Sequence, residues 1–374
     1  MKIALYILLG LALLISAFFA WFFLVFMKVS DLKIDENADS TVKLEQIDKW
    51  LTQLQQEGKF NGGVLIAKAG KPLLIKGYGY ADARKEQPLH EHTSFRLASV
   101  SKQFTATGIM LLKEQGKLNY DDLVTQYIPD FPYATVTIRQ LLNQTSGVPD
   151  NYLTLAEKNK TAIDILTNKK AIQLVIDANE AADFDAGTQY AYSNTNYITL
   201  AHLIAIISGQ SFEQFMQEQL FQPLDMQDSR VWNLLSADST FQNKAADMRN
   251  FKGNLTTLQP TFIDGVAGDG AIFSSLHDFL IWDRFWYGND LIDDEHLQEA
   301  FRTPTLADGE QSDYGFGWVV REDVVWHNGA WLGARTLNRR DRKEKTLLVI
   351  LDNGTNIMFD DIAQELVKVV RGGL

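Results

Sequence analysis

The chain begins with an almost continuous apolar segment. From Ile3 to Met27 only Gly10 and Ser16 interrupt the apolar residues. A helix of this length, rising about 1.5 Å per residue, exceeds the roughly 30 Å of a hydrocarbon core. A cleaved signal peptide is the alternative, but its apolar region runs to about 7 to 15 residues and ends in a small-x-small site, which this segment lacks. Residues 1–28 are therefore predicted to be an uncleaved transmembrane anchor.

Patterns typical of a folded domain follow a polar stretch at 29–43, which is predicted to be a tether. Apolar residues then recur with the helical period at Leu44, Ile47, Leu51 and Leu54. This spacing predicts an amphipathic helix. From Gly63 to Tyr80, two runs rich in β-branched and aromatic residues flank a short turn, which predicts a β-hairpin.

The middle third of the chain has helical character. A strongly periodic helix is predicted after Ser99. Two pairs with the spacing of a capping box, Thr137 with Gln140 and Ser211 with Gln214, indicate further helix starts. No strand is predicted in this stretch.

Strand patterns return near the C-terminus, in runs that begin at Tyr314, Val324, Ala334 and Thr346. A last helix carries Ile362, Leu366 and Val369 at helical spacing. Strands at both ends with helices between them predict an α+β fold, in which one antiparallel sheet includes both ends of the chain.

Length sets the expected domain organisation. The 374 residues exceed the roughly 250 to 300 at which one core usually stops growing, so two lobes with a cleft between them are expected. Residues 44–374 are assigned to the folded domain. Its α/β lobe is placed at about 44–130 and 262–374, and its helical lobe at about 131–261.

Composition excludes several classes of function. The absence of cysteine excludes disulfides, a cysteine nucleophile and thiolate metal ligands. A formal net charge of -12 repels nucleic-acid phosphates, so no nucleic-acid partner is expected. His90 and His92 flank Glu91, but without an HExxH pattern a surface loop is the favoured interpretation. No metal and no cofactor are predicted.

Serine chemistry does not need the G-x-S-x-G motif, which this chain lacks, because a Ser-x-x-Lys pair can support it. At a helix start the serine lies at the positive end of the dipole, and the lysine can accept its proton if the surroundings disfavour the charged amine. Matches begin at Ser30, Ser40 and Ser99. The first two fall in the predicted tether, with no helix to hold them, so Ser99 with Lys102 is selected.

A Tyr-x-Asn pair, a possible proton carrier and amide donor, occurs at Tyr192 to Asn194 and at Tyr287 to Asn289. The second follows an aromatic run typical of core. Tyr192 lies in a loop of small residues immediately before a helix, where catalytic groups are often displayed. Simple packing at a helix start is the alternative for Tyr192.

A third short motif, His327-Asn328-Gly329-Ala330, lies between two strand patterns. Its glycine permits close approach of a substrate, and the Ala330 amide is a candidate oxyanion donor beside that of Ser99. By itself, His327 would be read as an ordinary turn residue.

These motifs, in this order, resemble the serine β-lactamase and penicillin-binding-protein superfamily, nearest to its class C β-lactamases, D-alanyl-D-alanine carboxypeptidases and related esterases. The resemblance covers nearly everything from Leu44 to Val370. It includes stretches to which no catalytic duty is assigned, among them TSFRLASVSKQFTATGIMLLKEQGKL, TIRQLLNQTSGVPD and YGFGW.

The resemblance implies a role for each motif. Ser99 would be the nucleophile and Lys102 its proton acceptor. Tyr192 would act as general base or acid, and Asn194 would contact a substrate amide. The oxyanion hole would be formed by the amides of Ser99 and Ala330. The resemblance also implies an α/β lobe beside an all-helical lobe.

One departure bears on the substrate. The β-lactamases of this superfamily carry Lys-Thr-Gly where this chain has His327 to Gly329. A lysine there is cationic and helps to hold a β-lactam carboxylate, whereas a histidine with its ordinary pKa near 6.5 is mostly neutral. Efficient β-lactam hydrolysis is therefore not expected. Arg335 would supply the missing charge only if its strand brought it into the cleft; a surface arginine is the favoured interpretation.

The resulting hypothesis is a membrane-anchored, metal-independent serine hydrolase that forms an acyl-enzyme with a small ester, peptide or cell-wall-derived substrate. A D-alanyl-D-alanine carboxypeptidase, a weak β-lactamase and a non-catalytic penicillin-recognising sensor are the alternatives. The resemblance places the domain on the outer face of a bacterial cytoplasmic membrane, attached by a single span.

Overall fold

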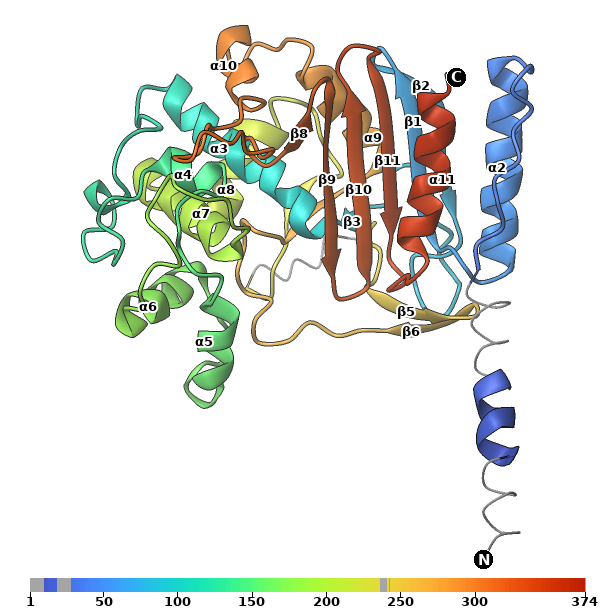
Figure 1. Ribbon diagram of the computed structural model, residues 1–374, viewed down its shortest axis with the longest axis horizontal. Helices are drawn as coiled ribbons and strands as arrows, with labels where there is room; N and C mark the ends of the chain where they lie inside the picture. Colours follow the sequence, from blue (N-terminus) through green and yellow to red (C-terminus); the bar gives the residue numbers. More distant parts are fainter. Residues whose placement is uncertain (1–9, 19–27, 236–240, 242, 374) are drawn as a thin grey trace, which may run out of the picture.

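A computed structural model describes residues 10–18, 28–235, 241 and 243–373 (Figure 1). Its largest sheet consists of β1 (Gly62–Lys68), β2 (Lys71–Tyr78), β8 (Val319–Arg321), β9 (Val324–Trp331), β10 (Ala334–Asp341) and β11 (Thr346–Asp352). All neighbours are antiparallel, in the order β2-β1-β11-β10-β9-β8. Strands from the first and the last part of the folded domain meet where β1 pairs with β11, with Val64 opposite Ile350. The predicted α+β fold with a sheet built from both ends is confirmed.

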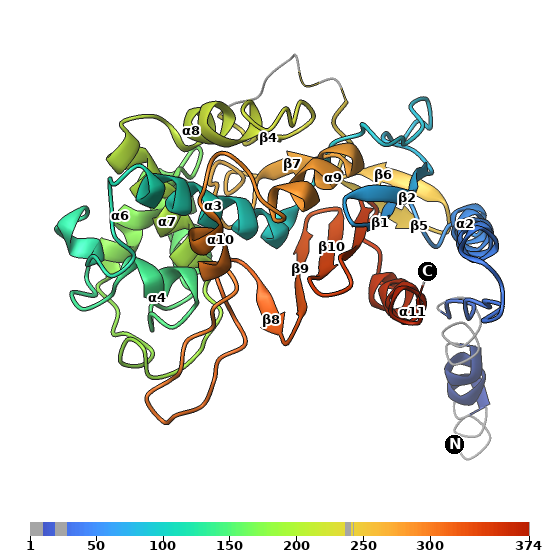
Figure 2. The ribbon, with the colours of Figure 1, turned by 90° about the horizontal axis from the view of Figure 1, so that it is seen from above.

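The two faces of this sheet belong to separate cores, because side chains alternate along a strand. The flanking helices are α2 (Ser40–Gln56), α3 (Ser101–Glu114), α9 (Leu276–Phe285) and α11 (Phe359–Arg371). Val64 and Ile66 pack in the core that contains residues of α2 and α11, whereas Leu65 and Ala67 belong to the larger core with α3 and α9. Figure 2 shows α9 and α11 on opposite sides of the sheet.

Most remaining helices form one cluster beside the sheet (Figure 1): α4 (Ile138–Leu142), α5 (Tyr152–Lys158), α6 (Asn168–Ala178), α7 (Asn194–Ser208) and α8 (Phe212–Met216). Helix α10 (Asp294–Glu299) comes later in the chain. The capping box of Thr137 and Gln140 is present at the start of α4. At α8 only half of the expected box forms, because Gln214 donates its side-chain amide to Glu218 instead.

The sequence missed five short strands. Strands β3 (Phe95–Arg96), β4 (Arg230–Val231) and β7 (Ile272–Ser274) form a small sheet in the order β3-β7-β4, and β5 (Met248–Phe251) pairs with β6 (Asn254–Thr257). Elements of two to four residues contain too few positions for an alternating pattern to be visible.

Two predicted boundaries were wrong. The run from Tyr314 is strand only at β8, because the chain first turns through Gly317, whose φ is +75°. A Cβ at Gly317 would lie 2.7 Å from the backbone of Lys102, so this turn packs directly on α3. Helix α2 begins at Ser40, inside the predicted tether, and Lys43 donates there to the backbone oxygen of Gly373, just after helix α11.

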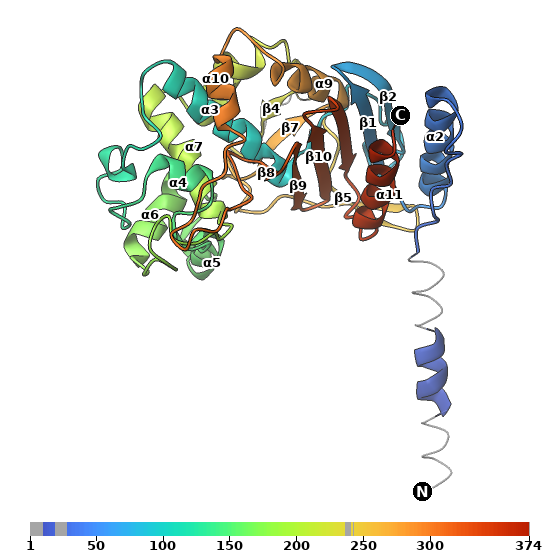
Figure 3. The same cartoon turned by 45° about the horizontal axis from the view of Figure 1, so that its top comes forward.

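Much of the predicted anchor lies outside the described residues. Residues 10–18 are helical and extend away from the folded domain (Figure 3). Their apolar side chains are exposed, as with Leu14 at 72%. Within the described parts of the chain, no helix has the length and apolar character needed to cross a membrane.

Candidate active site

Ser99 lies in a single 3₁₀ turn, Ala98–Val100, which connects β3 to α3. Ala98 has a φ of +49°, in the left-handed region that residues with a Cβ rarely adopt. The turn packs against β9, since a Cβ at Gly329 would lie 2.5 Å from the Leu97 carbonyl oxygen and 2.9 Å from the Ser99 nitrogen. The first and third motifs therefore meet through their backbones, and only glycine fits at position 329.

Lys102 follows on α3 and is completely buried. Its Nζ lies 3.2 Å from Ser99 Oγ, 2.8 Å from Asn194 Oδ1 and 2.8 Å from the backbone oxygen of Asp269. The amide and carbonyl oxygens can only accept, so Nζ donates one hydrogen to each of them. The remaining position on Nζ points toward Ser99 Oγ. An amine held in this way can take up the serine proton without moving.

Asn194 orients this lysine. Its Oδ1 accepts the bond from Lys102, while its backbone nitrogen and Nδ2 donate to the Asp150 carboxylate at 2.9 and 3.1 Å. Asp150 thus fixes both the start of α7 and the direction of the amide. The second hydrogen of Nδ2 is the one that the predicted contact with a substrate amide would use.

Tyr192 touches the other two motifs. Its ring centroid lies 4.9 Å from Lys102 Nζ and 6.1 Å from the centroid of the His327 ring. The backbone nitrogen of the next residue, Ser193, donates to Gln144 Oε1 at 3.0 Å, which holds the loop in place. The structure therefore brings the three motifs into one site, and the individual catalytic roles stay predictions.

His327 is buried and neutral. Its Nδ1 lies 2.6 Å from the backbone oxygen of Asn328, which only accepts, so Nδ1 carries the hydrogen. Nε2 then accepts from the Tyr314 hydroxyl at 2.9 Å. Burial, followed by the charge of Lys102, lowers the pKa of His327 to about 3. This residue therefore does not carry the charge of the lysine that it replaces.

The lowered pKa of His327 predicts a dependence of stability on pH. Because the unfolded chain binds this proton near pH 6.5 and the folded chain only near pH 3, the stabilisation present above pH 6.5 is lost as the pH falls through that window. Relative to a His327→Gln variant, the free energy of unfolding should fall by roughly 1 to 3 kcal/mol between pH 7 and 4.5. Urea unfolding of both proteins across this range measures the difference, and parallel profiles would contradict the expectation.

The strand edge beside Ser99 is partly open. Strand β8 pairs with β9 only from Val324 to Trp326, and further along β9 Ala330 pairs with Arg335 of β10. Thr336 of β10 donates its hydroxyl to the Leu97 carbonyl next to the Ser99 turn. Arg335 points to the opposite face because alternate residues face opposite ways, so it does not bring a positive charge to the site.

Residues 47–370 match the family model described as Beta-lactamase. The chain belongs to the β-lactamase family. It lies within the serine β-lactamase and penicillin-binding-protein superfamily, as the motifs indicated.

Relatives of this β-lactamase-family chain include penicillin-binding protein 4* of Bacillus subtilis (strain 168), with 34% identity over 83% of this chain and 72% of that protein. A D-aminopeptidase of Gluconobacter oxydans (strain 621H) is 26% identical over 78% of this chain and 55% of its own length. Among solved structures, the octameric penicillin-binding protein homologue from Pyrococcus abyssi has a TM-score of 0.75 and 23% identity, covering 88% of this chain and 77% of that chain. This last likeness shows the shared fold.

Three supporting residues of this β-lactamase-family site were missed by the sequence motifs. Asp150 ends TIRQLLNQTSGVPD and Tyr314 begins YGFGW, two stretches to which no catalytic duty had been assigned. In the structure, Asp150 accepts from the Asn194 nitrogen and the Tyr314 hydroxyl donates to His327. Asp269 is buried, which raises its pKa, and its carboxylate accepts from the Tyr152 hydroxyl at 2.7 Å. Asp150 and Tyr314 lie in stretches that resemble the family, whereas no quoted stretch includes Asp269.

Proposed function

We propose that this chain is a serine hydrolase that works through an acyl-enzyme on Ser99. The observation that carries the proposal is the buried Lys102 amine, fixed by two acceptors with its third direction toward Ser99 Oγ at 3.2 Å. Oγ attacks the substrate carbonyl while Lys102 takes its proton, and the backbone amides of Ser99 and Ala330 stabilise the oxyanion. The proton taken up by Lys102 is relayed through Tyr192 to the leaving group, so both side chains return to their starting protonation states. Water activated at the same place then releases the acyl group.

The charges around the site favour substrates without a carboxylate next to the reacting bond. His327 is neutral. Arg335 precedes Thr336, whose hydroxyl faces Leu97, so Arg335 lies on the other face of the sheet. A small pocket beside Ala98 is lined by Asp264 and Asp269. Arg96 also lines it, but its guanidinium is paired with Asp247 at 2.9 Å. We propose small esters and peptide amides with a neutral or cationic end, in line with the relative named as a D-aminopeptidase.

A panel of substrates tests this ranking. The full chain, purified in detergent, is assayed with p-nitrophenyl esters, D-amino-acid p-nitroanilides, a D-alanyl-D-alanine peptide and nitrocefin. Turnover of the first two classes is expected to exceed that of the last two by at least about tenfold, the effect of one missing charge-assisted contact. Nitrocefin turnover at the rate of a dedicated β-lactamase would show that the interpretation of His327 is wrong.

The same protein distinguishes the enzyme from a sensor. Intact-protein mass spectrometry after addition of a fluorophosphonate or a penicillin reports covalent addition. Labelling together with ester turnover supports the enzyme. A stable penicillin adduct without turnover of any substrate would assign the site to recognition only.

We propose in addition that residues 1–28 hold the domain at the outer face of a bacterial membrane. The apolar run from Ile3 to Met27 and the exposed apolar side chains of residues 10–18 support this. In intact cells, a protease added outside should remove the domain, and carbonate washing should leave the full chain with the membranes. Protection from the protease, with cytoplasmic marker proteins equally protected, would overturn the orientation.

A further inference from the structure

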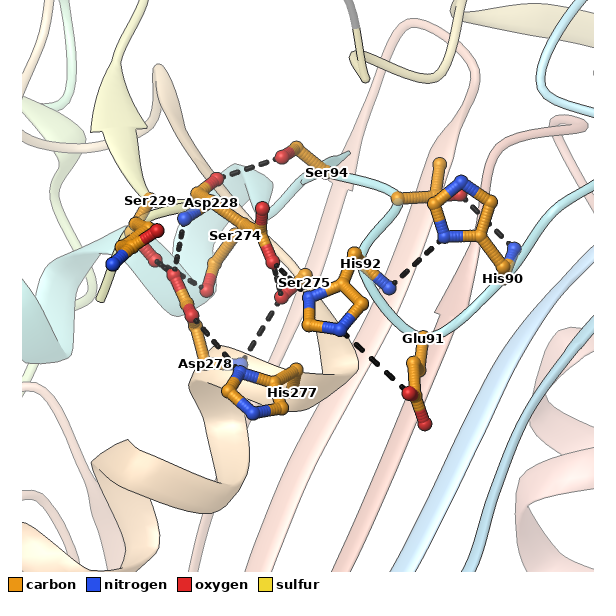
Figure 4. Close-up of polar contacts among 12 residues, drawn as sticks. His90, Glu91, His92, Ser94, Asp228, Ser229, Ser274, Ser275, His277 and Asp278 are labelled. Atoms are coloured by element: carbon orange, nitrogen blue, oxygen red, sulfur yellow. Dashed lines mark hydrogen bonds and ion pairs between the residues drawn. The ribbon is translucent and has the colours of Figure 1, made fainter. Parts of the chain in front are cut away.

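A second cluster of polar side chains lies outside the active site. Figure 4 shows His92, which precedes β3, next to Asp228, which precedes β4, and His277 at the start of α9. Strand β3 leads from this cluster toward Ser99, and its antiparallel partner β7 begins just after Asp269, which contacts Lys102. The cluster is therefore at the end of the small sheet remote from the catalytic lysine.

The three side chains already have the spacing of a metal site. One potential ligand atom from each of His92, Asp228 and His277 lies within 4.8 Å of the other two. His92 Nδ1 is 2.9 Å from Asp228 Oδ2, and the two imidazole centroids are 4.6 Å apart. In a tetrahedral site with bonds of about 2.0 to 2.1 Å, the ligand atoms are about 3.3 Å apart. The two rings are 45% and 44% exposed, which leaves them room to rotate toward that geometry.

The surroundings of the cluster resemble the second layer of a metal site. Ser275 Oγ donates to Asp228 Oδ2 at 2.9 Å, which orients that carboxylate. Asp278 is 1% exposed, and among the described residues its Oδ1 has no hydrogen-bond partner, although buried polar atoms usually have one. That oxygen lies 3.6 Å from His277 Nδ1. A carboxylate next to a ligand imidazole orients the ring and raises its basicity.

We propose that His92, Asp228 and His277 bind one Zn²⁺ ion, with solvent in the remaining position. Two imidazoles and one carboxylate suit Zn²⁺ better than they suit Mg²⁺ or Ca²⁺, which prefer oxygen ligands throughout. The side chains of His92 and His277 are 45% and 44% exposed, so an ion can enter from solvent. The acidic neighbours Glu91 and Asp278 add to the attraction for a cation.

Such an ion would be structural. It would join the loop before β3, the segment before β4 and the start of α9, three segments far apart in the sequence. Their common attachment is the small sheet that leads into the Ser99 turn. Zinc is therefore expected to raise the thermal unfolding midpoint, while leaving turnover at Ser99 unchanged. This agrees with metal-independent catalysis and adds the metal site that the sequence did not predict.

The test uses the untagged full chain in detergent, treated with EDTA, dialysed and titrated with ZnCl₂ by isothermal calorimetry. One ion per chain and a higher unfolding midpoint are expected. His92→Ala and His277→Gln should each weaken binding at least about tenfold, and Asp278→Asn should weaken it to a smaller extent. His92 and His277 lie in separate segments, so if one variant folds poorly the other still tests the site.

A matched control comes from a second cluster of potential ligands, formed by Glu114, Asp293 and His296. Their ligand atoms also lie within 4.8 Å of one another, but this cluster has only one imidazole. His296→Ala should bind zinc as the unaltered chain does. The proposal is overturned if micromolar zinc does not bind, or if His296→Ala abolishes binding that His92→Ala retains. Turnover of p-nitrophenyl esters is measured separately in the EDTA-treated and the zinc-loaded protein and is expected to be equal. A failure to bind zinc therefore leaves the proposed hydrolase untouched, and a failure to turn over esters leaves the zinc site untouched.

Discussion

Replacing Ser99 by alanine is expected to lower ester turnover by at least about 1,000-fold and to abolish covalent labelling by a fluorophosphonate. Oγ of Ser99 is the nucleophile in the proposed reaction, and alanine removes it without adding any atom to the turn formed by Ala98–Val100. The turn, with its left-handed residue at Ala98, should therefore keep its conformation. Turnover is followed with p-nitrophenyl esters, and labelling by intact mass.

The control is Ser101→Ala, which removes a hydroxyl two residues away. Ser101 is buried and its Oγ accepts from the Ile272 nitrogen at 3.2 Å, so its loss affects packing between α3 and β7 rather than the chemistry. This variant should still be labelled and should still turn over esters. If Ser99→Ala keeps the activity of the unaltered chain, the assignment of the nucleophile fails.

Replacing Lys102 by methionine is expected to lower turnover by about 100-fold to 10,000-fold, the usual contribution of a positioned general base. Methionine keeps the length and apolar stem of the side chain, but it leaves Asn194 Oδ1 and the Asp269 carbonyl without their donor. Each unsatisfied acceptor costs about 1 to 3 kcal/mol, so some loss of stability is expected as well. Fluorophosphonate labelling of Ser99 should become slow, since the serine proton has no acceptor.

Lys113→Met on the same helix separates catalysis from packing. Lys113 belongs to the last turn of α3, where its Nζ donates to Asn119 Oδ1 at 2.8 Å near the surface. Its replacement should change neither turnover nor the rate of labelling. A Lys102→Met protein that is folded by circular dichroism and labels at the normal rate would exclude Lys102 as proton acceptor.

The sequence identified the catalytic candidates because each lies in a short motif whose chemistry depends on local spacing. Ser99 and Lys102 lie three residues apart, and Gly329 and Ala330 lie two and three residues after His327. Joint agreement of three such motifs with a known superfamily was specific, whereas each motif alone was not. The sequence also predicted one antiparallel sheet with strands from both ends of the chain, because most of these strands are long enough to be recognised; the order of the strands came from the structure.

The supporting residues depend on contacts between distant segments. Asp150 and Asn194 are 44 residues apart, and Tyr314 and His327 are 13 apart on opposite sides of a turn. Neither pair has a spacing rule, because a loop can bring two side chains together from any separation. A neutral His327 was correctly expected from the ordinary pKa of histidine. The residues that hold this ring and Asn194 in place could not be found from the sequence.

By itself the sequence determined the family, the α+β fold, the candidate nucleophile and the absence of thiol chemistry, since these depend on composition, periodicity and local motifs. The tertiary structure decided the burial of His327, the face on which Arg335 lies and the partners of the Lys102 amine. It alone brought His92 to His277, although these residues are 185 positions apart. The physical reason is that charge, proton affinity and metal affinity depend on neighbours in space, which only the packed chain defines.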